Sequence, residues 1–193
     1  MEHPLSPPEA RDHIEMVDRI LAEYQPRLCG GGEFFVVWGI VGALITLVSE
    51  LAANSSLPKP ALWSIPALVA AGAIFSIVRG AQTRRGIART SLVQREFFNV
   101  LWVTLGMAFI VNIAVFRIFA GLASAAIWSV AEAIVLLYIG MHGNRWAQVA
   151  GVVVVVSLVA ANFAQPAIAA YILAAGMLAG YTGFGLAELL ARD

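Results

Sequence analysis

Glu132 is the residue of this sequence with the clearest potential for chemistry. It lies near the middle of an apolar stretch, residues 122–141 (LASAAIWSVAEAIVLLYIGM), that is long enough to cross a bilayer. An ionisable group at that depth is costly, so it faces protein or water rather than lipid. Removal from water disfavours the ionised form of a carboxylic acid. We therefore expect Glu132 to be neutral unless a cation or water reaches it.

Three further side chains are candidates for the surroundings of Glu132. Trp128 and Ser129 lie about one turn away on the same helical face, and Asn112 lies across the next hairpin at a similar depth. The sequence therefore predicts an ion or solute site formed by Glu132, Asn112, Ser129 and Trp128. The alternative is a protonated Glu132 that hydrogen-bonds to a neighbouring helix and only joins the helices.

A second candidate pair, Glu50 and Arg117, lies near the outer ends of two apolar stretches. The two side chains are expected either to form an ion pair at the rim of the bundle or to extend separately to the interface.

A basic segment at residues 79–95 carries five arginines and no acid: Arg79, Arg84, Arg85, Arg89 and Arg95. Between two membrane spans, such a segment sets topology and attracts anionic lipid head groups. A more specific alternative is that the acidic N-terminal helix docks on it. No glycine-rich phosphate motif accompanies these arginines and the net charge is +0, so we expect no nucleic-acid partner.

Signals of enzymatic catalysis, metal binding and cofactor binding are missing from the sequence. It contains no H-E-x-x-H and no G-x-S-x-G motif. All of its aspartates lie outside the apolar stretches, which argues against a membrane aspartyl protease. His142 has no second histidine or cysteine close by, and Cys29 is the only cysteine. We expect no enzyme activity, no metal site and no cofactor.

The elements that must position these residues are membrane-spanning helices. The chain has 193 residues, of which 60% are hydrophobic and 12% charged, more apolar surface than a soluble domain can bury. The predicted fold is an all-α, polytopic membrane protein with six transmembrane helices. The expected spans are residues 34–53, 61–78, 97–120, 122–141, 146–163 and 167–190.

The distribution of basic residues predicts the orientation. Only Lys59 and Arg117, two of the twelve basic residues, would lie on the side opposite the termini. This bias places both termini in the cytoplasm. All basic residues except Lys59 are arginine, which suggests a bacterial origin and hence the bacterial inner membrane. No cleavable signal peptide is visible, so the first span is expected to act as the insertion signal.

The first 32 residues are predicted to form a separate unit, an amphipathic cytoplasmic helix joined to the membrane domain (33–193) by a glycine joint. Apolar residues recur along it in alternating steps of three and four: Ile14, Val17, Leu21, Tyr24 and Leu28. This seam is expected either to join protomers of a homo-oligomer or to dock on the membrane domain of the same chain.

A short motif recurs in the membrane domain. Glu33-Phe34-Phe35 precedes Trp38, and Glu96-Phe97-Phe98 precedes Trp102. Together with the six spans, this recurrence suggests three hairpins repeated in parallel about an axis normal to the membrane.

Two function classes fit these observations better than an intramembrane enzyme does. The first is an oligomeric transporter or channel-like protein for a proton, ion or small solute, with a polar site at Glu132. The second is a sensor or assembly module that presents its N-terminal helix and basic loop to a cytoplasmic partner. In both cases membrane lipids, including anionic ones, are expected partners.

Overall fold

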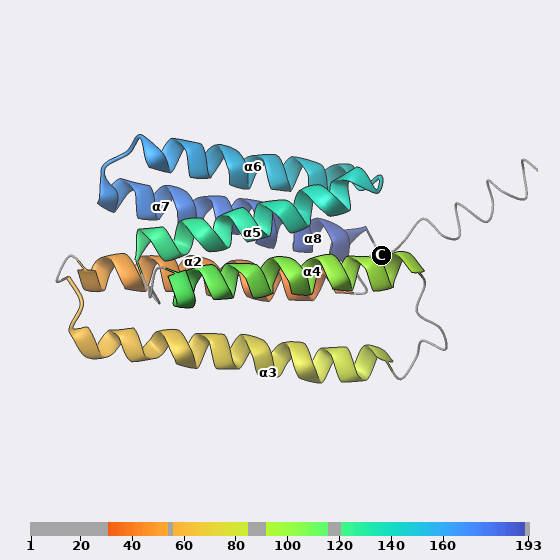
Figure 1. The fold of residues 1–193 in the computed structure, drawn as a ribbon, viewed down its shortest axis with the longest axis horizontal. Helices are drawn as coiled ribbons and strands as arrows, with labels where there is room; N and C mark the ends of the chain where they lie inside the picture. Colours follow the sequence, from red (N-terminus) through yellow and green to blue (C-terminus); the bar gives the residue numbers. More distant parts are fainter. Residues whose placement is uncertain (1–30, 54–55, 85–91, 116–120, 192–193) are drawn as a thin grey trace, which may run out of the picture.

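The computed structural model describes residues 31–53, 56–84, 92–115 and 121–191, and the elements in these ranges are all helical (Figure 1). In chain order they are α2 (Gly32–Ala53), the 3₁₀ turn η1 (Lys59–Trp63), α3 (Ser64–Arg84), α4 (Leu92–Ile110), the π-helical turn η2 (Val111–Val115), α5 (Leu122–Met141), α6 (Arg145–Asn162), α7 (Pro166–Met177), the π-helical turn η3 (Leu178–Thr182) and α8 (Gly183–Leu190).

Five helices are long and apolar enough to cross a membrane: Gly32–Ala53, Pro60–Gln82, Leu122–Met141, Arg145–Asn162 and Pro166–Leu190. Large apolar side chains such as Ile77 and Val156 are exposed on their outer faces, which suits contact with lipid. This is the architecture of a multi-pass helical membrane protein. The described apolar part of α4 and η2, Asn99–Ile113, is shorter, so the sixth span stays a prediction.

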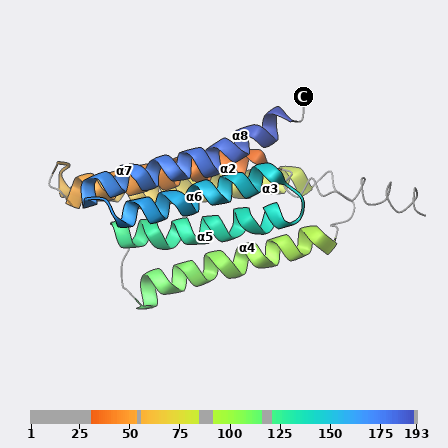
Figure 2. The same cartoon turned by 90° about the horizontal axis from the view of Figure 1, so that it is seen from above.

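Four helical segments pack on one another in the centre of the molecule: α2, α5, α6 and the consecutive helices α7, η3 and α8. The remaining two helices lie outside it, with α3 against α2 and α4 against α5 (Figure 2). The main apolar cluster joins α2, α5, α6, η3 and α8 through Phe35, Ala133, Val135, Leu136, Ile139, Ala147, Ala150, Val154, Tyr181 and Phe184.

Glycines allow the central helices to approach closely. A Cβ at Gly140 would lie 2.7 Å from the Cα of Gln148, which shows how tightly α5 packs on α6. A Cβ at Gly185 would lie 2.4 Å from the backbone oxygen of Gly32, so α8 meets α2 backbone to backbone. Small residues at helix contacts are the usual way that membrane helices gain packing energy.

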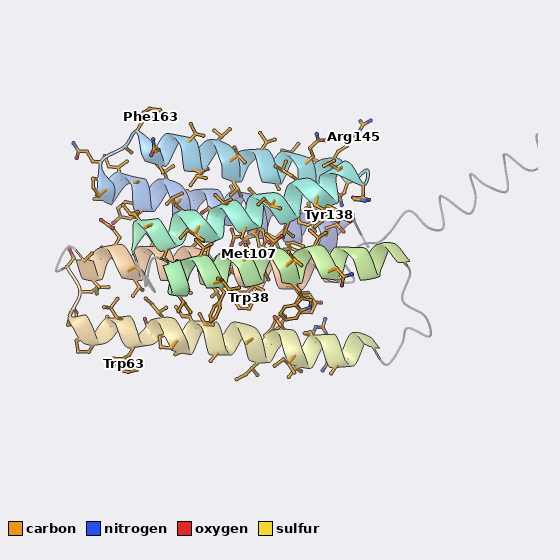
Figure 3. The ribbon with its side chains drawn as sticks, viewed as in Figure 1. Trp38, Trp63, Met107, Tyr138, Arg145 and Phe163 are labelled. Atoms are coloured by element: carbon orange, nitrogen blue, oxygen red, sulfur yellow. The ribbon has the colours of Figure 1, made fainter. Side chains whose placement is uncertain are left out.

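Helix α3 is attached to α2 by side chains along its length. Trp38 packs against Gly72, and its indole Nε1 donates to the Ser76 hydroxyl at 2.9 Å. Figure 3 shows Trp38 between the two helices. At the end of α3, Arg79 forms a bidentate ion pair with Glu33 at the start of α2.

The structure differs from the sequence expectation around α3. Its helix continues to Arg84, so part of the predicted basic loop is helical. Arginine is a good helix former, and the contacts of Arg79 with Glu33 and Gln82 hold this last part of the helix. Pro66 lies in the first turn of α3, where a missing N–H costs no hydrogen bond, which explains why it starts the helix rather than kinking it.

The ends of the helices separate into two groups. Trp63 and Phe163 lie at one end of the bundle, and Tyr138 and Arg145 lie at the other (Figure 3). The start of α2, the end of α3, the start of α4 and the end of α8 share the second end (Figure 1). The amphipathic N-terminal helix and its seam lie outside the described residues, and the threefold hairpin repeat stays a prediction.

Candidate functional site

Glu132 lies where three helices meet. Its side chain is only 8% exposed although it stands in the middle of α5. A Cβ at Gly42 on α2 would lie 3.4 Å from the Glu132 Oε1 and 3.1 Å from the Met177 Sδ on α7. The carboxyl group therefore lies beside Gly42 at the junction of α2, α5 and α7.

One oxygen of this carboxyl group is buried without a hydrogen-bond partner. Among the described residues, the buried side-chain atoms in that condition are the Glu132 Oε2 and the Ser49 Oγ. Buried polar atoms are nearly always paired, and exceptions indicate an absent water or ion, or a functional role. Ser49 belongs to α2 and Glu132 to α5, the two helices that meet at Gly42 and Glu132.

The residues that the sequence predicted beside Glu132 have the following positions. The Ser129 hydroxyl donates to the Ala125 carbonyl of its own helix at 2.9 Å. The Asn112 Nδ2 donates to the Ser124 Oγ at 3.1 Å, which ties η2 to α5 about two turns from Glu132. Trp128 packs beside the small buried cluster of Ala43, Ala174 and Met177.

Helix α2 contributes a buried polar face that the sequence analysis missed. Thr46 and Ser49 are each 3% exposed, and Glu50 is 8% exposed. The Thr46 hydroxyl donates to the Gly42 carbonyl at 2.9 Å and also approaches the Met177 Sδ at 3.7 Å. The signal was present in the sequence, because positions 42, 46, 49 and 50 recur at the spacing of one helical face.

The register between α2 and α5 fixes the depths at which their polar side chains lie. The two helices run in opposite directions (Figure 1), and Gly42 stands at the level of Glu132. Ser49 comes seven residues after Gly42, and Ala125 comes seven residues before Glu132. Because the helices are antiparallel, Ser49 and Ala125 lie at the same level, about 10 Å from Glu132 along the helix axis. Thr46 and Ser129 lie at depths between these two levels.

The buried polar residues therefore occupy one half of the bundle. All of those in the described chain fall between Glu132 and the end of the bundle where α2 ends and α5 begins: Thr46, Ser49, Glu50, Asn112, Ser124, Ser129 and Glu132. We call this set of buried polar residues, which come from α2, α5 and η2, the polar seam. The other half is filled by apolar side chains, among them Phe35, Leu136 and Ile139.

Two polar contacts close the opposite end of the bundle, and sequence reasoning missed both pairings. Arg79 and Glu33 join α3 to α2. Asn144 caps α6 by accepting from the Ala147 N–H at 3.0 Å, and its Nδ2 donates to the Glu188 Oε1 at 2.7 Å. The second contact fastens the α5–α6 turn to α8.

Other predicted site residues fall partly outside the described chain. Arg117, Arg85 and Arg89 are not described, nor are the side chains of Arg84 and Arg95. The predicted Glu50–Arg117 pair and the anionic-lipid contacts therefore stay predictions. The His142 Nδ1 lies 2.8 Å from the Tyr138 carbonyl oxygen and donates its proton to it. Among the described residues, no group of three or more His, Cys, Asp or Glu side chains is arranged to hold a metal ion.

Comparisons of the chain with models of protein families, with curated proteins and with solved structures gave no match.

Proposed function

We propose that this protein is an oligomeric transporter or channel-like protein of the bacterial inner membrane, with Glu132 as its binding site for a proton, ion or small solute. The observation that carries the proposal is the Glu132 Oε2, a carboxyl oxygen buried at a three-helix junction without a described hydrogen-bond partner. A carboxyl group with no structural partner at that depth costs stability, so its presence favours a functional role.

The distribution of polar residues supports the same proposal. The polar seam leads from Glu132 toward one end of the bundle, and apolar side chains fill the other half. Polar groups that lead to an ionisable residue inside a helix bundle are typical of ion pathways in membrane proteins. A role as a helix-joining residue would instead require a partner for the carboxyl oxygen.

The remaining parts of the proposal come from the sequence. The proposal places both termini in the cytoplasm because of the distribution of arginines. Oligomerisation follows from the small number of spans, which seldom enclose a complete pathway.

The test is flux in proteoliposomes containing the full chain or the Glu132→Gln variant. Glutamine keeps the shape and hydrogen-bonding capacity of the side chain but cannot carry a charge or exchange a proton. We expect Glu132→Gln to abolish flux while the protein still folds and assembles. Glu188→Gln is the matched control, because it neutralises a carboxylate but keeps an acceptor for Asn144.

A second arm of the experiment removes residues 1–29. Transport requires Glu132 and tolerates this deletion, whereas a module that presents its N-terminal helix to a partner shows the reverse. A fully active Glu132→Gln protein would contradict the proposal.

A further inference from the structure

We propose that the species handled at Glu132 is the proton, and that it reaches Glu132 along water molecules held in the polar seam, with Ser49 as the first residue of the route. This inference rests on the proposed function and deepens it. It assigns Ser49 and Thr46 on α2 to the pathway.

The first argument is the position of the two unpaired atoms. The Glu132 Oε2 and the Ser49 Oγ lie on facing helices, seven residues apart in register. A buried hydroxyl of a 3% exposed residue without a partner is a site for an ordered water. The two atoms therefore mark two candidate water sites within the polar seam, about 10 Å apart in depth.

The second argument is the chemistry between them. Thr46 and Ser129 each donate their hydroxyl proton to a carbonyl of their own helix, at 2.9 Å in both cases. A hydroxyl oxygen that donates one bond still has lone pairs that accept from water. The intermediate depths therefore present acceptors that hold water about one turn apart, over the roughly 10 Å that separates Ser49 from Glu132.

The third argument excludes a metal cation at Glu132. Hard cations such as Ca²⁺ take six or more oxygen ligands, and Mg²⁺ requires octahedral oxygen coordination. Beside Gly42 lie the Glu132 Oε1 and the thioether of Met177. In the part of the chain that the structure describes, no group of three or more His, Cys, Asp or Glu side chains is arranged to hold a metal ion. A single carboxyl oxygen in such surroundings suits a proton, which needs one acceptor atom.

The transfer step is simple and balanced. A water of the seam that carries an extra proton gives it to the Glu132 carboxylate at Oε2, which leaves a neutral water and a neutral carboxylic acid. Among the described residues, the other buried titratable groups are Glu50 on α2 and Tyr181 on η3. Glu50 lies at the outer end of the seam, and Tyr181 belongs to the apolar half.

The experiment measures proton uptake with a pH-sensitive dye inside proteoliposomes after external acidification, with the membrane potential clamped. Ser49→Ala should slow uptake about tenfold, because one hydrogen bond to water is worth about 1.4 kcal/mol in the barrier. Ser157→Ala is the matched control: this serine lies in α6 with its hydroxyl bonded to the Val153 carbonyl at 2.8 Å. It should leave the rate unchanged.

A second readout tests for water directly. In a Cys29→Ser background, Ser49→Cys should react with a small water-soluble thiol reagent, and Ser157→Cys should not. An unreactive Ser49→Cys, or proton uptake that Ser49→Ala leaves unchanged, would overturn the inference.

The outcomes separate this inference from the proposed function. Sodium, rubidium or solute flux that depends on Glu132 without acidification would overturn the proton assignment and leave the transport proposal standing. Absence of any flux that depends on Glu132 would overturn both.

Discussion

The carboxyl group of Glu132 lies against the backbone of Gly42: a Cβ at Gly42 would come within 3.4 Å of its Oε1. This contact between α2 and α5 sets the register of the polar seam. A methyl group added at Gly42 would touch the carboxyl group and would press against the Met177 Sδ, 3.1 Å away.

Gly42→Ala is therefore expected to reduce flux through Glu132 without unfolding the protein. The added methyl group lies 3.1 Å from the Met177 Sδ, and a flexible methionine end can move aside at small cost. Flux and thermal unfolding in detergent measure the two effects separately. Gly80→Ala is the control, because no atom lies within 4 Å of its added Cβ. Equal flux from both variants would contradict this prediction.

Glu132→Leu is expected to lose flux and yet to melt at the same temperature as the wild type or higher. Leucine removes a carboxyl group whose Oε2 has no described hydrogen-bond partner. The folded protein then no longer bears the cost of burying that polar group, and no described hydrogen bond is broken. The measurement is thermal unfolding in detergent beside Glu132→Gln. A large fall in the melting temperature for leucine alone would show that Glu132 joins helices through a hydrogen bond.

The ion pair between Glu33 and Arg79 is expected to stabilise the attachment of α3 to α2. Glu33→Gln and Arg79→Gln should each lower the melting temperature, because each leaves one charge without its partner. The charge-swapped double variant Glu33→Arg/Arg79→Glu should recover part of the loss, since bidentate arginine–carboxylate pairs are specific in geometry. A double variant no more stable than the single variants would show that the pair contributes nothing to the α2–α3 contact.

Gly185→Ala is expected to destabilise the α2–α8 contact by about 1–3 kcal/mol, the usual cost of overpacking. Its Cβ would lie 2.4 Å from the Gly32 oxygen and 2.7 Å from the Val36 nitrogen, and neither backbone atom can move without shifting a helix. Gly183→Ala in the same helix is the control, because its nearest atom, the Leu178 oxygen, is 3.8 Å away. Unfolding in denaturant should separate the two variants, and equal stabilities would contradict the packing described.

Topology is tested by labelling single cysteines in a Cys29→Ser background. Pro58→Cys should react with a membrane-impermeant reagent from outside the cell, and Gly86→Cys should react only after permeabilisation. The expectation follows from the arginine bias. Pro58 directly precedes η1, which leads into the start of α3, whereas position 86 follows the end of α3. External labelling at position 86 would reverse the orientation.

The sequence by itself determined the helical class and the membrane environment, because both follow from local properties. Hydropathy over about twenty residues identifies spans regardless of how they pack, and α5 occupies the predicted range 122–141. The choice of Glu132 as the candidate site residue also followed from sequence alone, because a carboxylate within an apolar stretch can be recognised without knowing which helices pack around it.

Only the tertiary structure decided what surrounds Glu132. The predicted neighbours Asn112 and Ser129 bond to other groups, whereas Gly42 and Met177, from helices distant in sequence, border the carboxyl. Helix-to-helix register depends on which small residues let two backbones approach, as at Gly32 and Gly185, and hydropathy carries no information about that choice. The polar face of α2 became part of a site only when that register brought it opposite α5.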